Sequence, residues 1–216
     1  MFILPGGATV AVEPVAISLT DNTVNGSNLT TYTFSSQSLG TAAASRQIVV
    51  GVIASGAGPA RTVSSLTIGG VSASLIKAQT GQSEGNTEIW SAAVPSGTTG
   101  DVVVVLSSGW NRCGFGVWRM TGASTSASDT GGSVANPLND SLDIPANGGA
   151  IGLSHNQLDA TTDWTNLDED YDEEVGASVY QSGASKTFAA AQSALSITAA
   201  AGSSSPQMAL ASWGPA

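Results

Sequence analysis

The single histidine of the chain lies in a polar segment that raises the question of hydrolytic chemistry. His155 stands between Ser154 and Asn156, and Asp159 and Asp163 follow it. A Ser-His-Asp hydrolase needs a serine within reach of the imidazole and a carboxylate that orients the ring. Adjacent residues of a strand point to opposite faces, so Ser154 and His155 cannot form that pair. We therefore expect a structural histidine at a strand end and no catalytic residues.

Acidic side chains are densest between residues 168 and 174, which read Asp-Glu-Asp-Tyr-Asp-Glu-Glu. Calcium favours several carboxylates on a flexible loop, but the spacing differs from that of an EF-hand loop. Glycoside hydrolysis needs two carboxylates flanking a cleft, and no second carboxylate stands out. We expect a solvated acidic loop, with calcium binding by this loop as the alternative, and no cofactor.

The five tryptophans divide into those in apolar runs and those in polar segments. The tryptophans in apolar runs, predicted to be core residues, are Trp90, Trp118 and Trp213. Trp110 and Trp164 have polar neighbours instead. An exposed indole beside Arg112 can stack on a sugar ring, or the ring can close the end of a sandwich. We favour burial, because aromatic rings gain so much from it. Trp110, Arg112 and Trp164 are the glycan contacts of the alternative interpretation.

The charges of the chain argue against two classes of partner. Sixteen Asp and Glu residues outnumber six Lys and Arg residues, which gives a formal net charge of −10. Nucleic-acid binding needs a basic footprint to neutralise phosphates, and an anionic membrane would repel the chain. We expect neither a nucleic-acid nor a membrane partner.

The cysteine and histidine counts limit how the fold can be stabilised. Cys113 is the only cysteine, so no intrachain disulfide can form, and zinc sites built from several Cys and His are excluded. The apolar start of the chain lacks the basic region and the long apolar run of a signal peptide. The fold must rest on its hydrophobic core.

Strands must position all of these side chains, because strand patterns fill the chain and helix signals are nearly absent. Residues 48–54 and 102–106 are continuous β-branched runs, typical of strands buried on both faces. Residues 62–78 alternate on either side of Gly69-Gly70, which predicts a hairpin with a primed turn. Residues 113–121 alternate large apolar residues with glycines, which would leave room for large neighbouring side chains.

About ten short strands separated by turn residues predict an all-β fold, namely a single jelly-roll-like β-sandwich. Further strands are predicted at residues 31–35, 87–94, 150–155, 177–181, 194–199 and 208–213. Residues 123–147 read as a long surface connection. Residues 149–153 and 208–212 look loosely alike, which adjacent core strands would explain without a tandem repeat. The predicted organisation is an N-terminal arm, residues 1–13, and a sandwich domain, residues 14–216.

Several turn and core patterns of the chain carry a resemblance to a known group of proteins. They lie at residues 69–73, 92–104, 114–118, 164–169 and 211–216. In these patterns the chain resembles β-sandwich proteins of tailed bacteriophages and related prophages, over roughly residues 46–216. The resemblance implies a structural role in the virion, as a head decoration, a head fibre or a tail component, and it brings no catalytic residues.

We therefore expect a non-enzymatic virion protein that binds other copies of itself and other virion proteins. The apolar tip Phe2-Ile3-Leu4 is followed by flexible glycines, and we predict that it docks on a neighbouring subunit or on the capsid. A carbohydrate-binding module for host surface glycans is the alternative function, and a glycan-degrading enzyme is the third.

Overall fold

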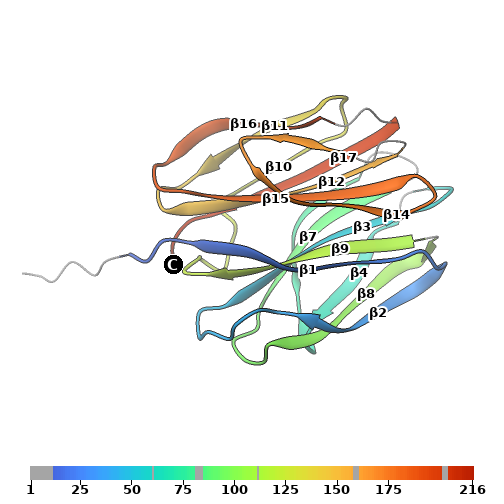
Figure 1. Cartoon of the computed structure of the whole chain (residues 1–216), viewed down its shortest axis with the longest axis horizontal. Coiled ribbons are helices and arrows are strands. Elements are labelled where there is room, and N and C mark those ends of the chain that lie inside the picture. Colours follow the sequence, from blue (N-terminus) through green and yellow to red (C-terminus); the bar gives the residue numbers. More distant parts are fainter. Residues whose placement is uncertain (1–11, 60, 81–84, 111, 158–160, 201–203) are drawn as a thin grey trace, which may run out of the picture.

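The computed structural model describes residues 12–59, 61–80, 85–110, 112–157, 161–200 and 204–216. Every regular element in these residues is a β-strand, which confirms the predicted all-β class (Figure 1). The strands are β1 (Ala16–Asn25), β2 (Leu29–Ser38), β3 (Gln47–Ser55), β4 (Val63–Ile68), β5 (Val71–Ser72), β6 (Ser74–Gln79), β7 (Gly85–Ala93), β8 (Thr99–Trp110), β9 (Arg112–Thr121), β10 (Asp129–Ser133), β11 (Leu138–Ile144), β12 (Gly148–Gln157), β13 (Asp163–Thr165), β14 (Asp168–Gly176), β15 (Val179–Phe188), β16 (Gln192–Ala200) and β17 (Ser204–Trp213). None of the described residues forms a helix long and apolar enough to cross a membrane.

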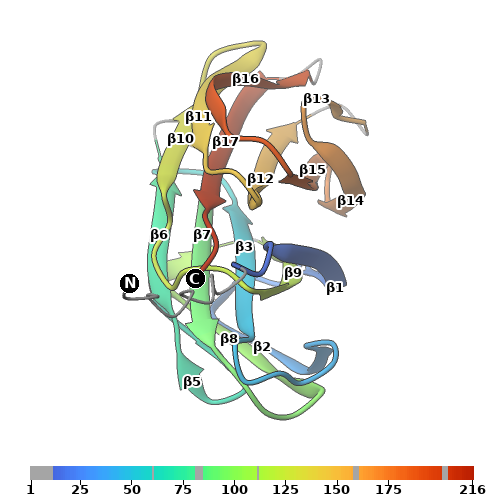
Figure 2. The ribbon, with the colours of Figure 1, turned by 90° about the vertical axis from the view of Figure 1, so that its left-hand side faces the viewer.

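The strands form four antiparallel sheets that stack as layers (Figures 1 and 2). In stacking order, sheet 1 is β2-β8-β4-β5, sheet 2 is β1-β9-β3-β7-β6, sheet 3 is β10-β17-β12-β15-β14, and sheet 4 is β11-β16-β13. Sheets 1 and 2 enclose one core, sheets 3 and 4 enclose another, and sheets 2 and 3 face each other between them. The prediction of a single sandwich of about ten strands is therefore wrong, because the chain folds into two sandwiches.

The two halves of the chain repeat one strand order. Without β5, each half has eight strands, so β1–β4 and β6–β9 can be paired one by one with β10–β17 in chain order. Replacing each strand of sheet 2 by its equivalent then gives the strand order of sheet 3, and replacing β2-β8-β4 gives the strand order of sheet 4. The short strand β5 has no counterpart. Across the inner sheets, β1 contacts β14 and β6 contacts β10, so equivalent strands lie at opposite edges, as a two-fold axis parallel to the strands requires.

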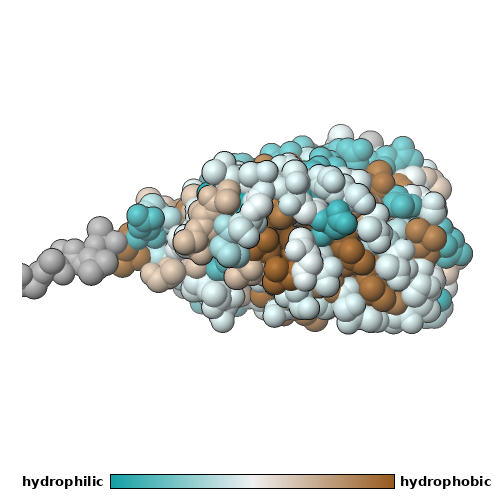
Figure 3. Space-filling view, turned by 90° about the horizontal axis from the view of Figure 1, so that it is seen from below, coloured by the Kyte–Doolittle hydropathy of each residue, from teal (hydrophilic) through white to brown (hydrophobic). Residues whose placement is uncertain are grey.

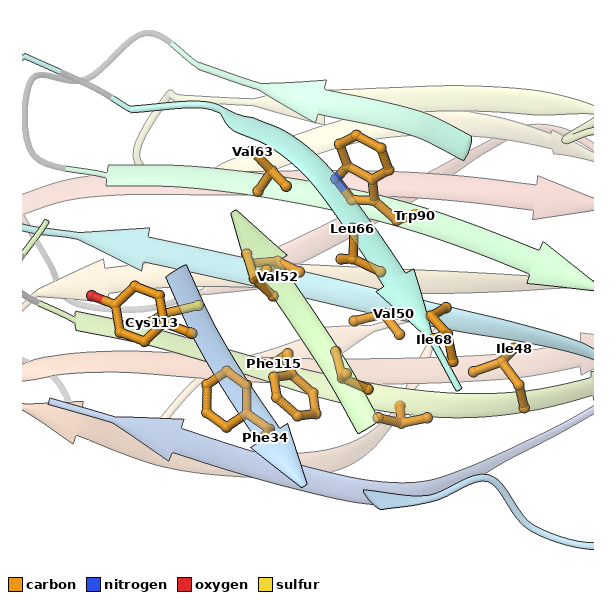
Figure 4. Close-up of a cluster of buried hydrophobic side chains, with 14 of the residues drawn as sticks. Phe34, Ile48, Val50, Val52, Val63, Leu66, Ile68, Trp90, Cys113 and Phe115 are labelled. Carbon is orange, nitrogen blue, oxygen red and sulfur yellow. The ribbon is translucent and has the colours of Figure 1, made fainter. Parts of the chain in front are cut away.

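The core between sheets 1 and 2 is rich in aromatic and β-branched side chains (Figure 4). Phe34 of β2 contacts Phe115 of β9 edge to face, with ring centroids 4.6 Å apart. Trp90 lies in the same cluster, which confirms its predicted burial. Apolar alternation on facing strands produces this core, because side chains at every second position point to the same side.

The space between sheets 2 and 3, which we call the seam, is apolar over most of its length. Trp118, Ile151, Leu153 and Trp213 are fully buried there. The seam also confirms the predicted use of glycines in β9. A Cβ atom at Gly116 would lie 2.6 Å from the Tyr171 ring, so the glycine makes room for that ring.

The predicted hairpin at Gly69-Gly70 forms only in part. Both glycines have positive φ, at 56° and 80°, as a primed turn requires. The strand after the turn pairs with β4 through Val71 and Ser72, and the Ala73 N–H donates to the Leu66 carbonyl oxygen at 2.9 Å before the pairing ends. The chain then crosses from sheet 1 to sheet 2, where β6 pairs with β7. The alternation beyond the turn is therefore real, but it belongs to two sheets.

Two segments predicted as loops are strands at sheet edges. The long connection at residues 123–147 contains β10, at the edge of sheet 3, and β11, at the edge of sheet 4. The acidic run forms β14, an irregular strand in which Tyr171 and Val175 are buried and the acidic residues are exposed or half-buried. An edge strand carries polar side chains outside, so its few inward residues give a weak sequence signal.

The alike segments 149–153 and 208–212 lie in the adjacent strands β12 and β17, as expected.

Candidate binding site between the inner sheets

A row of three polar side chains crosses one end of sheet 3 and points into the seam. His155 of β12 lies opposite Gln181 of β15 on one side and opposite Gln207 of β17 on the other. All three residues are fully buried. We call Gln207, His155 and Gln181 the polar row. It ends the apolar packing that fills the rest of the seam.

Sheet 2 covers the polar row with glycines. A Cβ atom at Gly85 of β7 would lie 2.6 Å from His155 Cε1 and 2.7 Å from Gln207 Nε2. A Cβ atom at Gly114 of β9 would lie 2.9 Å from Gln181 Oε1. Any larger residue would displace the polar side chains, so these two glycines create the space that the polar row occupies.

The polar row has unmet hydrogen-bonding capacity. Neither ring nitrogen of His155, and neither amide atom of Gln181 or Gln207, has a hydrogen-bond partner among the described residues. Thr87 Oγ1, on the facing strand β7, has none there either. A buried polar group without a partner costs about 1–3 kcal/mol. These unmet groups are concentrated at one place in the seam.

A pocket opens to solvent next to the polar row. Its volume is about 240 Å³, and its lining includes Ser55 and Arg112 from sheet 2 and Gln157 and Val179 from sheet 3. Arg112 is half-buried, and its Nη1 donates to the carbonyl oxygen of Gly176. Its Nε is buried without a partner in the described residues. The pocket is thus the mouth of the seam, and it carries one cationic side chain.

Burial controls the protonation state of His155. Removal from water lowers the pKa of the imidazole to about 4, and the positive charge of Arg112 acts in the same direction. The backbone of Ser205 raises this pKa, although its geometry is outside that of an ordinary hydrogen bond. The ring is therefore neutral at pH 7, with one nitrogen that donates and one that accepts.

Within the part of the chain that the structure describes, no serine and carboxylate are placed to complete the hydrolase considered from the sequence. Ser154 precedes His155 in β12 and points to the opposite face, towards sheet 4. Asp163 lies on β13 of sheet 4, and Asp159 lies outside the described residues. Residues 81–85 also read Gly-Gln-Ser-Glu-Gly, a Gly-x-Ser-x-Gly pattern. Its last glycine begins strand β7, whereas a nucleophile elbow leads into a helix. Residues 81–84 lie outside the described residues.

The residues of the glycan interpretation lie in three different layers. Trp110 is buried in the core between sheets 1 and 2, with the Arg61 guanidinium 5.9 Å from its ring centroid. Arg112 lines the mouth of the seam. Trp164 packs between sheets 3 and 4, and its Nε1 donates to Ser182 Oγ over 2.8 Å. The three do not form one surface, and glycan binding by them stays a prediction. The predicted arm residues Phe2, Ile3 and Leu4 lie outside the described residues.

The carboxylates of β14 make structural contacts. Asp170 accepts a hydrogen bond from Trp118 Nε1 at 2.7 Å, and Asp172 accepts one from the backbone of Thr162 at 3.0 Å. Lys186 forms an ion pair with Asp168, with 2.7 Å between Nζ and Oδ1. The described residues contain no group of three or more His, Cys, Asp or Glu side chains placed to hold a metal ion. Calcium binding by this strand stays untested.

Two buried charges hold the first sandwich together. The Arg46 guanidinium donates to the carbonyl oxygens of Leu39, Gly40, Val94, Ser96 and Gly97. The Glu88 carboxylate accepts from the Val63 backbone at 3.0 Å and from Trp90 Nε1 at 2.7 Å. Burial raises the pKa of Glu88, while its hydrogen bonds lower it. These contacts fix loops and strands within the core.

Comparison of the chain with known protein families, with curated proteins and with solved structures finds no match. The resemblance to phage proteins therefore stays a prediction.

Sequence reasoning identified His155 but not the two glutamines beside it. Gln181 ends a predicted strand and Gln207 directly precedes another. Within one strand, such a glutamine looks like a surface residue. The alternation within each strand did contain a signal. Gln181 lies two residues from Val179 and Gln207 two residues from Ala209, so each glutamine shares the inward face with an apolar residue. Only the pairing of β15, β12 and β17 brings them together.

Proposed function

We propose that the chain is a non-enzymatic structural protein of a tailed-phage particle, which acts by packing against other copies of itself and other particle proteins. The phage setting comes from the sequence resemblance. The structural observation that supports an assembly role is the outer face of sheet 1.

The outer face of sheet 1 carries little charge. Asp101 is the only charged residue among the described residues of β2, β8 and β4. Thr31 and Thr33 of β2 are exposed, and Val103 and Val105 of β8 are half-buried on the same face. In Figure 3, which views the molecule from below, white and brown areas dominate and teal is sparse. A protein with a net charge of −10 can bring such a face against a partner without strong repulsion.

An apolar pocket lies where the described chain enters the fold. Its volume is about 330 Å³, and Pro14, Val15 and Phe188 are part of its lining. Residues 1–11 precede this point. If the apolar tip Phe2-Ile3-Leu4 docks on a neighbouring copy, the same pocket of that copy is a receptor of matching chemistry.

The face is tested by placing one positive charge on either outer sheet. Thr33→Lys alters the exposed face of sheet 1, and Thr165→Lys makes the matched change on β13 of sheet 4, where the threonine is also exposed. We expect the Thr165→Lys and unchanged proteins at full copy number in purified particles, and Thr33→Lys depleted several-fold. Equal copy numbers would remove this face as the interface. A chain absent from purified particles would end the particle proposal itself.

The arm is tested separately by deleting residues 1–7. Loss of the deleted protein from particles, or a smaller oligomer in solution, is the expected result. Unchanged particle occupancy would refute the arm.

A further inference from the structure

We propose that two copies of the chain pair through β2, antiparallel across a two-fold axis, so that sheet 1 of one copy continues into sheet 1 of the other. The pairing names a contact by which copies join in the assembly role above, and it rests on that role for its setting. The contact itself follows from the edge of sheet 1 and is tested in solution.

β2 is a long edge strand without a charged residue, and it lies beside β8 at the margin of sheet 1 (Figures 1 and 2). The edge strands of the four sheets are β1, β2, β5, β6, β10, β11, β13 and β14. Each edge strand longer than two residues contains Asp, Glu or Lys, except β2. Proteins protect an exposed edge from pairing by charged side chains, prolines or very short strands. β2 has none of these, and its threonines and aromatic residues favour strand pairing.

The peptide groups of Thr31 and Thr33 point away from sheet 1. On β8, the Asp101 carbonyl oxygen accepts a hydrogen bond from the Gly69 N–H, on the side of β4, at 2.8 Å. Hydrogen-bond direction alternates along a strand, so the next residue of β8, which lies opposite Phe34, bonds towards β2. Phe34 is thus bonded within the sheet, and the alternate residues Thr33 and Thr31 present their N–H and C=O groups outwards. In the described residues, only β8 pairs with β2.

The regular part of this edge has a defined end. Ser36 has a positive φ of 58°, and its N–H donates to Asp101 Oδ1 at 2.9 Å. The Ser38 N–H donates to Asp21 of β1 at 2.7 Å. The edge that a further strand can pair with is therefore residues 29–35, which we call the free edge.

A second copy of the chain is the partner that fits the free edge. With a net charge of −10, two copies repel unless the contact keeps their acidic side chains apart. Pairing of β2 with any other long edge strand would place a charged residue in the contact, whereas pairing of β2 with β2 places none there. An antiparallel pair centred on Thr33 sets Thr33 opposite its counterpart, with mutual N–H···O bonds, and sets Tyr32 opposite Phe34. The two Asp101 carboxylates then lie at opposite ends of the pair.

The pairing stops at two copies. A two-fold contact uses the same surface of both copies, so the dimer has no free β2 left. The other edge of sheet 1 is β5, which has only two residues and is too short to recruit a further strand. The expected assembly is therefore a closed dimer and not a fibre.

The first measurement is made on the full chain in solution. Sedimentation velocity over a range of concentrations should show a dimer that dissociates on dilution. In the dimer labelled with ¹⁵N, the amide protons of Thr31 and Thr33 should exchange slowly with solvent, because each donates to the other copy. A monomer at every concentration, or a dimer in which these two amide protons exchange quickly, would overturn the proposal.

Thr33→Pro removes an outward N–H group and leaves the bonds between β2 and β8 in place. Proline is tolerated on an edge strand where the N–H faces solvent. The dimer loses two hydrogen bonds, one from each copy, so its dissociation constant should rise at least tenfold. Ser141→Pro is the matched control on β11, the equivalent of β2 in the second half, where the Ser141 N–H donates to Asp140 Oδ1 at 2.8 Å. The control should leave the dimer intact, and equal dissociation constants for the two variants would contradict the pairing.

Two lysine variants keep the test decisive if Thr33→Pro does not fold. Thr33→Lys places like charges opposite each other across the two-fold axis and should raise the dissociation constant about tenfold. Ser65→Lys alters an exposed residue of β4 on the same outer face, because Ser65 and Thr31 both lie opposite Val105, and it should leave the dimer unchanged.

The outcomes separate this pairing from the particle role. Equal weakening by Thr33→Lys and Ser65→Lys would place the contact on the outer face and overturn the pairing, with the assembly role intact. A dimer with slow Thr31 and Thr33 amide exchange, formed by a chain absent from purified particles, would support the pairing and end the particle role.

Discussion

The N-terminal and C-terminal halves share a strand order but differ in what fills them. The first core contains Tyr32, Phe34 and Phe115 among β-branched neighbours. The second is built from Leu, Ile, Ala and Met, with Trp164 and Phe188 only partly buried at its margin. The same connections therefore form around different side chains. Alternation of inward apolar and outward polar side chains, with a total side-chain volume that fills the core, is enough to specify this topology. Particular aromatic contacts add stability to it.

The two halves also differ in the contacts at the start of the equivalent strands β3 and β12. At the start of β3, Arg46 ties together five carbonyl oxygens through a buried guanidinium. At the start of β12, Gly148 instead lets backbone pack against backbone, since a Cβ atom there would lie 2.6 Å from the Trp213 carbonyl oxygen. In the first half, the loops beside β3 are held by hydrogen bonds from the Arg46 guanidinium. In the second half, the corner beside β12 is held by backbone atoms packed directly against each other at Gly148.

Truncating one equivalent core residue in each half should separate the halves most strongly. Phe115 lies opposite Val52 on β3, and Met208 lies opposite Ser154 on β12, at matching places in the two sheets. We expect Phe115→Ala to lower the free energy of unfolding by about 4 kcal/mol, and Met208→Ala by about 2 kcal/mol, because the larger ring leaves the larger cavity. Urea denaturation measures both. Equal losses would show that the aromatic core carries no extra stability.

Acid should weaken the contact between the halves. Folding lowers the pKa of His155 from 6.5 to about 4. Between these two pH values, His155 is protonated in the unfolded chain and neutral in the folded chain. Above pH 6.5 neither state binds this proton and the folded state has its full stability. As the pH falls from 6.5 towards 4, the free energy of unfolding decreases by about 3 kcal/mol. Denaturation at pH 7 and pH 4 checks it, with His155→Gln as the control that should lose this part of the pH dependence. An identical pH dependence in both proteins would contradict the assignment.

The smallest contrast concerns two tryptophans anchored by matching strands. Glu88 of β7 and Ser182 of β15 occupy equivalent places, opposite Val52 and Ser154, and each accepts an indole N–H. Trp164→Phe should cost about 1 kcal/mol, the value of a neutral hydrogen bond, and Trp90→Phe about 2 kcal/mol, because a buried carboxylate loses a donor. Thermal unfolding of both variants tests this order, and a reversed order would contradict it.

Sequence reasoning succeeded where the local pattern was strong. The β-branched runs at residues 48–54 and 102–106 lie in β3 and β8, both central in their sheets. It failed at the polar edges, where β10 has no large apolar residue and β14 buries only Tyr171 and Val175. The second sandwich was missed for this reason. The polar row was missed because Gln181 and Gln207 gain their meaning from the register of three strands, which no local pattern contains.

The seam has the form of a dimer interface inside one chain. Only residues 122–128 separate β9 from β10, so the two sandwiches meet at an effective concentration that the linker fixes. Dilution would dissociate two separate subunits but cannot separate these halves. Because the linker already holds the two sandwiches together, the contact between them needs a smaller favourable free energy of association. A covalently joined pair can therefore keep a polar end in the seam, which two free subunits would have to offset with additional apolar area.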